Sequence, residues 1–450
     1  MLELATMDQS TPEPLRPRLL SGTLKDHDGE IVHIEGWLHK KRLLGGLTFI
    51  NIRDRRGLTQ VVVKDKNEVE KLRGLQIGSV LAIDGKVTNE PRAPGGAELH
   101  DPSITVLVPV TIEPPIEIDK PLSHKSENLD TLFDHRALGL RNLQEATIFR
   151  LRSELLKYIR EFLYDRDFIE INTPKLVAGA AEGGAEVFKT DYFGKEATLA
   201  QSPQLYKQIM VGVFERVFEI APAFRAELSA TTRHVSEVTM LDVEMGFISS
   251  HDEVLNLVQD LLYEVLTRLY KEHNNELTKL NAPELKLKPV FPRYSMAEIH
   301  KLYQKETGKD MTQEIDLTPE EEKWICNYAK EKESCEAVFA TGLPISKMKF
   351  YHMKDNNQST RSADLLFRGI EISTVPQREH RYERLIEQMK AAGIDPDSPG
   401  FAPYVAAMKH GLPAHGGFGF GIDRLTEKAI GLSNVKEAIL FPRDINRLSP

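Results

Sequence analysis

Short apolar runs and turn signals alternate between residues 31 and 112. The runs IVHIEGWLHKK, LTFINIRD, LTQVVVK and SVLAIDGKV are separated by LLGG and RRG, and APGG follows the last of them. Apolar positions that recur every second residue between such turns are typical of strands. Five short strands over this length predict a small β-barrel, with the OB-fold as the candidate.

Helical spacing appears after residue 140. Ile148, Leu151, Leu155, Ile159 and Phe162 recur three or four positions apart and predict an amphipathic helix over 146–165. The other elements expected here are a long helix with apolar positions from Val254 to Leu269, strands at 216–226, 236–246, 362–374 and 416–421, and a helix from about 422. Strands in runs, without crossover helices between them, indicate an α+β domain with an antiparallel sheet flanked by helices.

The chain therefore divides into four parts. Residues 1–30 form a polar N-terminal extension, 31–112 the barrel, 113–140 a linker with the sequence EPPIEIDKPLSHKS, and 141–450 the large domain. Within the large domain, 275–360 is charged and mixed, and is treated as an insertion region.

Composition narrows the cellular setting. The 450 residues contain no run of about 18 apolar residues, so no transmembrane helix is expected. The first residues lack the pattern of a secretory signal. Cys326 and Cys335 fit neither a zinc site nor a disulfide framework, which favours a reducing cytoplasm.

Charge is distributed unevenly. The net charge is −9, which argues against unspecific nucleic-acid binding. Between Glu35 and Lys66, however, there are eight basic residues and only three acidic ones. A basic barrel surface that also carries Phe49 favours single-stranded nucleic acid over a plain solvated surface.

Polar residues concentrate on strands that should border the core. On the hairpin 218–245, Arg225 and Glu227 share one face, and Asp242 and Glu244 share a face of the return strand. The connecting loop adds Arg233 and His234. Arginines placed this way can grip a polyphosphate.

Two downstream segments supply further ligands. In FRGIEISTVPQREHR, Glu371 and Thr374 offer hard oxygen ligands for Mg²⁺, and Arg378 can bind a carboxylate. In HGGFGFGIDRL, the glycines allow a flat ring or a phosphate to approach the backbone, and Arg424 follows at a helix start.

Taken together, these motifs resemble those of class II aminoacyl-tRNA synthetases of subgroup b, and are most similar to archaeal-type aspartyl enzymes. EFLYDRDFIEINTPKL resembles motif 1, FRAE…RHVSE…LDVE motif 2, and GFGFGIDRL motif 3. QSPQLYKQ (201–208) resembles the amino-acid pocket strand, the stretch at 179–186 the flipping loop, and LFPRDINRLSP the C-terminus. The resemblance covers about 30–450.

The resemblance implies a role for each matching residue. For L-aspartate these are Glu182, Ser202, Gln204, Lys207, Arg225, Asp242, Thr374 and Arg378, with Lys207 and Arg378 on the side-chain carboxylate. For ATP they are Arg225, Glu227, Arg233, His234, Val235, Glu371, Gly421, Ile422, Asp423 and Arg424. Arg225, Glu371 and Arg424 would be catalytic, Glu371 and Thr374 would hold Mg²⁺, and Arg42, Phe49, Gln60 and Glu98 would read the anticodon.

The reaction implied needs no nucleophilic side chain. The aspartate α-carboxylate attacks the α-phosphorus of ATP, and the 3′-terminal ribose of tRNA then takes the acyl group, so catalysis is positioning and charge neutralisation. The partners implied are tRNA(Asp), L-aspartate, ATP and a second copy of the chain through 146–176. His234 is expected either to contact ATP or to hold its own loop.

Some positions depart from the family pattern. Val238 stands where an adenine-stacking Phe is usual, Val375 and Pro376 replace small residues, and Thr374 replaces a Ser. His39 and Pro94 occupy positions where enzymes that discriminate between tRNAs carry Trp and Lys. This pair resembles the non-discriminating type, which also charges tRNA(Asn); neutral surface variation is the alternative.

Three rival functions remain in view. An asparaginyl-tRNA synthetase is the nearest, but Lys207 and Asp242 favour aspartate. A non-catalytic tRNA-binding paralogue would be expected to lose Arg225, Glu371 or Arg424, and all three are present. A tRNA-independent amide ligase would lack the N-terminal barrel.

Overall fold

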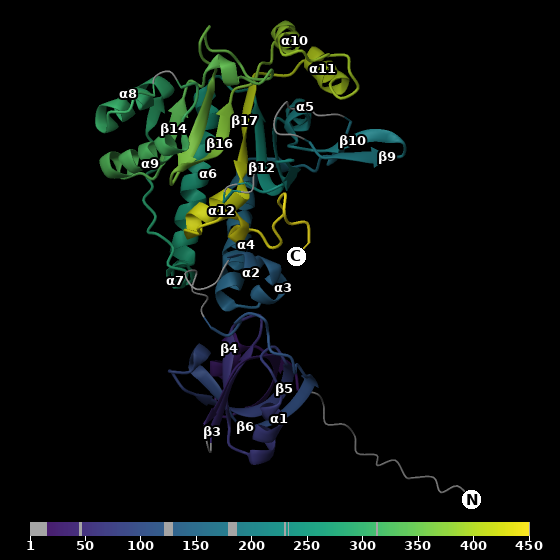
Figure 1. Ribbon diagram of the computed structural model, residues 1–450, viewed down its shortest axis with the longest axis vertical. Helices are drawn as coiled ribbons and strands as arrows, with labels where there is room; N and C mark the ends of the chain where they lie inside the picture. The colour runs from purple at the N-terminus through teal and green to yellow at the C-terminus, as the bar shows by residue number, and fades with distance from the viewer. Residues whose placement is uncertain are drawn as a thin grey trace, which may run out of the picture. The chain divides into compact units, whose positions relative to one another are not determined.

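The computed structural model describes residues 16–44, 47–120, 129–178, 187–228, 231–232, 234–311 and 314–449. It divides into two compact units, residues 1–145 and 146–450, which are described separately (Figure 1). None of the helices among these described residues is long and apolar enough to cross a membrane.

The first unit contains the expected barrel. Its strands are β1 (Arg18–Leu19), β2 (Ile31–Leu44), β3 (Leu47–Arg53), β4 (Leu58–Val63), β5 (Val80–Asn89) and β6 (Ala97–Val108), in the order β1-β2-β3-β4-β6-β5. Pairing of β2 with β5 closes the barrel. Alternate residues such as Ile50, Ile52, Val61 and Leu99 fill its interior. The predicted OB-fold is confirmed.

One basic residue of the barrel, Lys41, stabilises the end of a helix. Lys41 points to the end of α1 (Lys66–Arg73), where its Nζ donates to the carbonyls of Leu72, Arg73 and Leu75 at 2.6–3.2 Å. A cation at a helix C-terminus stabilises the exposed carbonyls. Lys41 is therefore a helix cap, although it was counted in the basic surface.

The stretch 113–140 is partly folded. It contains α2 (Leu129–Asp134) and α3 (Arg136–Gly139), and Ile116, Ile118 and Leu132 form a small core. The buried Arg136 guanidinium donates to Glu145 at 2.5 Å. This part, expected to be a linker, therefore contains helices and a small apolar core.

An eight-stranded sheet organises the second unit, in the order β13-β14-β15-β16-β17-β12-β11-β7. The strands are β7 (Ile169–Glu170), β11 (Arg216–Phe224), β12 (Glu237–Gly246), β13 (Arg293–Ser295), β14 (Ala337–Thr341), β15 (Ser362–Phe367), β16 (Ile370–Pro376) and β17 (His415–Gly421). The central pairs are antiparallel as expected, but β7–β11 and β13–β14 at the two ends are parallel, so the sheet is mixed.

Helices cover one face of this sheet and build the main core. α4 (Leu143–Tyr164), α6 (His251–Glu272) and α12 (Ile422–Ile430) contribute apolar side chains that pack against Leu241, Val243, Phe418 and Phe420 of the central strands. The two long helices expected from apolar spacing are confirmed. Their packing leaves the opposite face of the central strands for polar side chains.

Residues 275–360, treated as an insertion region from the sequence, contribute strands to the sheet of this domain. The region contains β13 and β14 of the sheet, most of α7 (Asn274–Lys279), and α8 (Met296–Thr307) and α9 (Pro319–Glu333), which pack in a core of their own. Its two short strands were not predicted from the sequence, because a strand of three to five residues shows too little alternation of apolar and polar positions.

The rest of the second unit lies around the polar face. It comprises β8 (Leu176–Val177), the hairpin β9 (Lys189–Tyr192) and β10 (Lys195–Leu199), α5 (Gln204–Phe214), α10 (Tyr382–Ala391) and α11 (Ala402–Lys409) (Figure 1). In the segment 201–208, expected as a strand, residues 201–203 form a loop and residues 204–208 form the first turns of α5. The helical spacing of Leu205, Gln208 and Val211, all buried, explains this difference.

Candidate active site

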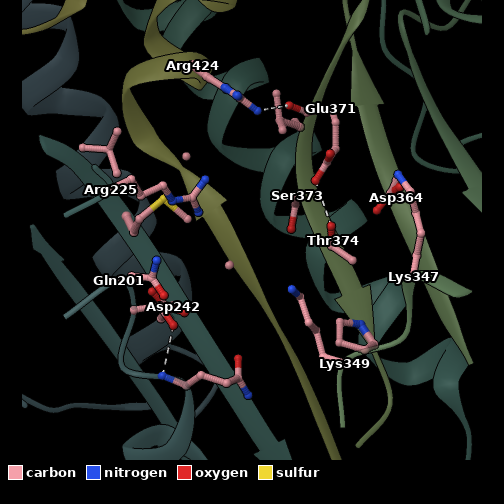
Figure 2. A pocket seen from close by; sticks show the side chains of 18 of the residues that line it. Gln201, Arg225, Asp242, Lys347, Lys349, Asp364, Glu371, Ser373, Thr374 and Arg424 are labelled. Atoms are coloured by element: carbon pink, nitrogen blue, oxygen red, sulfur yellow. Dashed lines mark hydrogen bonds between the residues drawn. The ribbon is translucent and has the colours of Figure 1, made fainter. Parts of the chain in front are cut away.

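Four polar or small residues lie in one row across the uncovered face of the sheet. Asp364 on β15 pairs with Thr374 on β16, Thr374 with Gly419 on β17, and Gly419 with Asp242 on β12. Directly paired residues in a sheet point to the same face. Figure 2 shows the side chains of Asp364, Thr374 and Asp242 along the cavity that results.

The glycines of β17 form the floor of this cavity. Gly417, Gly419 and Gly421 alternate with the buried Phe418 and Phe420, so the strand gives phenylalanines to the core and bare backbone to the cavity. A Cβ at Gly417 would come within 2.4 Å of Glu244 Oε2. The GFGFG pattern thus creates space between the flanking strands.

The cavity has a volume of about 510 Å³. It brings together most of the residues implied by the resemblance: Ser202, Gln204, Arg225, Glu227, His234, Val235, Asp242, Glu371, Thr374, Arg378, Gly421, Asp423 and Arg424. Ile422 is buried in the core instead, and Lys207 lies beneath the cavity wall. Glu182 and Arg233 fall outside the described residues.

Two buried ion pairs lie at the deep end of the cavity, where Arg378 and Asp242 line it and their partners Glu244 and Lys207 lie behind them. The Arg378 guanidinium binds Glu244 with two hydrogen bonds, Nε to Oε1 and Nη2 to Oε2, both 2.9 Å. Lys207 Nζ donates to Asp242 at 2.9 Å and to the Phe418 carbonyl at 3.0 Å, and lies 3.6 Å from Glu244. Both cations expected to bind the substrate carboxylate are therefore also partners of protein carboxylates.

Electrostatics keep the Glu244 carboxylate charged and the neighbouring histidines neutral. Burial would raise the pKa of Glu244, but Arg378 and Lys207 outweigh it and lower that pKa. Burial lowers the pKa of His415, and that of His352 falls well below its usual value through burial and the nearby Arg378. The deep end is thus two cations, two anions and two neutral imidazoles.

A second corner of the cavity has the donors of a metal site. Asp364 faces Glu371, and the Thr374 hydroxyl donates to Glu371 Oε1 at 2.8 Å. Burial and the Glu371 charge raise the pKa of Asp364 well above its ordinary value. Asp364 Oδ1 is buried without a hydrogen-bond partner. Two carboxylates that repel each other beside a hydroxyl fit a hard divalent cation such as Mg²⁺.

Unsatisfied polar atoms gather in this cavity. Of the six buried side-chain polar atoms without a partner in the described structure, three line it: Gln204 Nε2, Asp364 Oδ1 and Ser373 Oγ. Such atoms cost about 1–3 kcal/mol each unless something binds them. Their concentration here indicates a site built for a polar ligand.

The charged residues of motif 3 play different roles. Arg424 lies at the cavity, where its Nη1 donates to the Glu371 carbonyl at 3.1 Å. Asp423 instead accepts hydrogen bonds from Arg152 at 2.8 Å and from the Thr239 backbone N–H at 2.7 Å. Asp423 therefore joins α12 to β12 and α4, with little left to offer ATP.

His234 makes one contact that bears on its two expected roles. Its Nδ1 lies 2.6 Å from the Thr231 hydroxyl within the same loop, and the residue also borders the cavity. The loop-holding role therefore has a partner, and contact with ATP stays a prediction.

Several cavity residues were missed by the sequence reasoning. Asp364, Lys347, Lys349 and His352 all line the cavity, and all come from β15 or from the loop before it. A single aspartate inside the apolar strand SADLLF was the available signal for Asp364. The loop residues gave no signal in the sequence, because no periodic pattern of apolar positions surrounds them.

The expected anticodon residues share one patch of the barrel. Arg42 pairs with Phe49 across β2 and β3, and Gln60 with Glu98 across β4 and β6, where Gln60 Nε2 donates to Glu98 at 2.7 Å. Phe49, Gln60 and Glu98 alternate with buried residues of the interior, so they face outward, and Arg42 is exposed. Phe49 is partly exposed, as a stacking surface requires.

The two residues expected to affect tRNA choice differ in setting. His39 is the extra residue of a β-bulge in β2, is buried, and has a pKa lowered by burial and by Arg53. Pro94 is partly buried in the turn that joins β5 to β6. His39 is therefore part of the barrel wall and not a freely variable surface residue.

Comparison with known proteins gives consistent matches over the whole chain. Residues 128–445 match the family of class II tRNA synthetases (D, K and N), and residues 32–107 match the OB-fold nucleic acid binding domain. The aspartate–tRNA(Asp/Asn) ligase of Thermus thermophilus is 42% identical over 436 residues, 96% of this chain and 100% of the relative. The aspartate–tRNA(Asp) ligase of Pyrococcus furiosus is 39% identical and covers 97% and 100%.

Solved structures agree with these matches. Asparaginyl-tRNA synthetase from Pyrococcus horikoshii, complexed with asparaginyl-adenylate, superimposes with a TM-score of 0.86 at 30% identity, over 94% of this chain and 97% of that one. A putative aspartyl-tRNA synthetase from Leishmania major gives 0.88 at 29% identity, over 99% and 97%.

Proposed function

Since the chain belongs to the class II aspartyl-tRNA synthetases, we propose that it ligates L-aspartate to both tRNA(Asp) and tRNA(Asn) through an aspartyl-adenylate. The cavity on the polar face of the sheet is the site of activation. The single observation that carries this proposal is the pair of buried cations, Arg378 and Lys207, at the deep end of the cavity, which suits an amino acid with an anionic side chain.

The substrate lies along the row of paired residues. Its side-chain carboxylate points to Arg378 and Lys207. Its ammonium group meets the Asp242 carboxylate and the side-chain oxygen of Gln204. Arg225 lies on the same side of the cavity as Asp242 and across from Glu371 and Thr374 (Figure 2), and there it holds the α-carboxylate near the α-phosphate. Fixing both reactants in this way replaces a bimolecular encounter by an intramolecular one.

Charge neutralisation completes the activation step. One oxygen of the aspartate α-carboxylate bonds to the α-phosphorus as pyrophosphate leaves, and Arg225 and Arg424 stabilise the added negative charge. Asp364, Glu371 and Thr374 would hold Mg²⁺, which when bound supplies positive charge for the phosphates. The two carboxylates orient that charge, and Arg424 is held beside them through the Glu371 carbonyl.

The barrel supplies tRNA recognition in this proposal. Phe49 stacks on an anticodon base, and Arg42, Gln60 and Glu98 contact base edges on the same outer face. His39 and Pro94 lack the bulk and the charge that would exclude the third anticodon base of tRNA(Asn). Relatives that charge tRNA(Asp) alone and relatives that charge both tRNAs are similar to this chain. The proposed charging of tRNA(Asn) therefore rests on His39 and Pro94.

A homodimer also belongs to the proposal. β7 is the edge strand of the sheet, and exposed apolar residues surround it: Tyr164, Ile169, Val213, Phe214 and Phe247. Ile169 pairs with Val217 on β11, and the Gly246 N–H bonds to the Glu215 carbonyl, so these residues share one corner. The apolar stripe of α4 lies in the chain's own core, which leaves the strand edge as the interface.

Aminoacylation of purified tRNA(Asp) and tRNA(Asn) transcripts with aspartate and with asparagine tests the proposal. We expect aspartate to be attached to both tRNAs, with rates within about tenfold, which corresponds to about 1.4 kcal/mol. Preferential attachment of asparagine would identify the enzyme as an asparaginyl-tRNA synthetase. Charging of tRNA(Asp) alone would remove only the wider tRNA specificity.

A further inference from the structure

Two aromatic side chains are exposed at the tip of the hairpin formed by β9 and β10. Phe193 is 90% exposed and Tyr192 is 49% exposed, whereas large aromatic side chains ordinarily bury most of their surface. Their ring centres lie 4.9 Å apart in an edge-to-face arrangement, which leaves most of Phe193 open to solvent. Figure 1 shows the hairpin projecting from the rest of the second unit. The tip therefore presents aromatic surface that the cores of the chain do not use.

The backbone at this tip is strained for the residue that it carries. Phe193 and Gly194 both have left-handed conformations, φ 52° and φ 79°, in the two-residue turn between Tyr192 and Lys195. Such a turn favours Asn-Gly, because asparagine tolerates a positive φ and a bulky side chain does not. Since Phe193 is almost fully exposed, packing within the chain does not offset this strain. A strained and exposed aromatic residue points to contact with another molecule.

The hairpin leads directly into the active-site cavity. Strand β10 is followed by Gln201, which lines the cavity. The Phe224 N–H bonds to the Ala200 carbonyl at 3.0 Å, so the base of the hairpin lies beside Arg225. Gln201 follows Phe193 by eight positions, and eight residues of extended chain span about 26 Å. A molecule that contacts the tip can therefore also reach the cavity.

The size and chemistry of the tip favour a nucleotide over a protein surface. Two aromatic side chains offer about 150–250 Å² each, and a stable protein interface needs about 800 Å² from each partner. The surroundings are polar, since all four residues of β9 are exposed and Lys189 pairs with Glu196 at 3.2 Å. Lys195 is exposed next to the turn. Aromatic rings beside a lysine are typical of surfaces that stack a base and meet a phosphate.

We propose that Phe193 and Tyr192 bind the 3′-terminal strand of tRNA by stacking on one of its bases, while Lys195 meets a neighbouring phosphate. This inference rests on the proposed function, because it names a further contact with the tRNA that the enzyme charges. The stacked base lies within the last several nucleotides, since the tip is about 26 Å of chain from the cavity. Every base has a π-face, so the contact serves tRNA(Asp) and tRNA(Asn) alike.

Phe193→Asn separates tRNA binding from folding. Asparagine before Gly194 forms the preferred turn, so the thermal midpoint of this variant should equal or exceed that of the unaltered enzyme. In aminoacylation by the full chain, the KM for both tRNAs should rise about tenfold, which corresponds to about 1.4 kcal/mol. Aspartate-dependent pyrophosphate exchange without tRNA should stay within twofold. Phe193→Tyr, which keeps an aromatic ring, should retain a tRNA KM close to the unaltered value.

Val290→Asn is the matched control, because Val290 is an exposed apolar residue outside the hairpin, and its tRNA KM should not change. An unchanged tRNA KM in Phe193→Asn overturns the inference. So does an equal loss of pyrophosphate exchange, which would indicate a role in the fold of the site. A halved sedimentation mass of Phe193→Asn would also overturn it, because the tip would then join two copies of the chain. Failure of the unaltered enzyme to attach aspartate to either tRNA would instead contradict the proposed function, and this inference with it.

Discussion

Arg378 makes aspartate recognition depend on one buried guanidinium. Replacing it in Arg378→Leu removes the partner of the substrate carboxylate and leaves Glu244 charged in a buried site. Losing one member of such a pair costs about 3–5 kcal/mol, so aspartate-dependent pyrophosphate exchange should fall more than a hundredfold. Retention of unaltered exchange would exclude Arg378 from the substrate site.

A second variant separates binding from folding. Arg378→Met combined with Glu244→Gln removes both charges, so its thermal midpoint should exceed that of Arg378→Leu. Its exchange activity should remain as low, because the substrate carboxylate still lacks its partner. Recovery of activity together with stability would show that Arg378 acts only through the fold.

The corner of the cavity formed by Asp364, Glu371 and Thr374 predicts an unusual effect of replacing Asp364 on stability. Its pKa is raised by burial and by Glu371, so ionising it at neutral pH costs stability when no cation is bound. Asp364→Asn should therefore raise the thermal midpoint in the absence of Mg²⁺ and abolish activity. Thermal melts with and without Mg²⁺ and ATP provide the measurement.

The ligand response gives the control for that variant. A ligand at a hundred times its dissociation constant stabilises the fold by about 2.7 kcal/mol. Mg²⁺ with ATP should thus raise the midpoint of the unaltered enzyme by several degrees, and that of Asp364→Asn much less. An equal shift in both proteins would show that Asp364 is not a ligand.

Single residues were predictable where they sit inside a sequence motif with fixed spacing. Glu371 lies on β16, Arg225 and Arg378 follow the ends of β11 and β16, and all three line the cavity. Lys349 and His352 were not found, because only the pairing of a loop with a distant strand brings them there. The use of Asp423 as a bridge to Arg152 likewise depends on contacts across 271 positions of sequence.

At the scale of elements, the bulge in β2 holds His39, one of the two residues expected to affect the choice of tRNA. His39 is the unpaired residue of that bulge and is buried against the wall, near Arg53. Introducing His39→Trp with Pro94→Lys adds bulk and charge at the expected anticodon site. Charging of tRNA(Asn) should then fall, while charging of tRNA(Asp) stays within a few-fold, because one correct base contact is worth about 1–3 kcal/mol.

The control uses the same barrel. Phe49→Ala removes the stacking surface shared by both anticodons, so it should reduce charging of both tRNAs alike. If the unaltered enzyme already prefers tRNA(Asp) several hundredfold, His39 and Pro94 do not determine the choice. Pyrophosphate exchange without tRNA should be equal in all these variants.

Elements of regular periodicity were predictable, and short ones were not. The alternating runs of the barrel and the apolar stripes of α4 and α6 matched the structure because each spans several periods. β13, with three residues, has no period to detect, and its place in the sheet depends on β14. The N-terminal part of α5 was mistaken for a strand because its first residues serve the cavity and interrupt the apolar pattern.

At the scale of the whole molecule, the exposed corner around β7 predicts a stable dimer. Sedimentation at micromolar concentration should give twice the chain mass of 50.9 kDa. Ile169→Asp with Phe247→Asp places charges at the interface and should produce a monomer with an unchanged barrel. Phe247 has a left-handed backbone conformation, φ 57°, which aspartate tolerates.

An exposed apolar residue outside that corner serves as the comparison. Val290→Asp changes a side chain that is 69% exposed, and it should leave the mass unchanged. Dissociation by this variant too would point to a different interface. A monomer in the unaltered protein would contradict the predicted assembly.

The GFGFG strand described above also ties correct folding to catalysis. Because side chains alternate, a slip of β17 by one residue would turn Phe418 and Phe420 into the cavity and the glycines into the core. The same slip would place phenylalanine side chains in the substrate cavity and leave a cavity in the hydrophobic core. A misaligned chain would therefore be inactive and unstable at once, so every molecule that stays folded also holds an open active site.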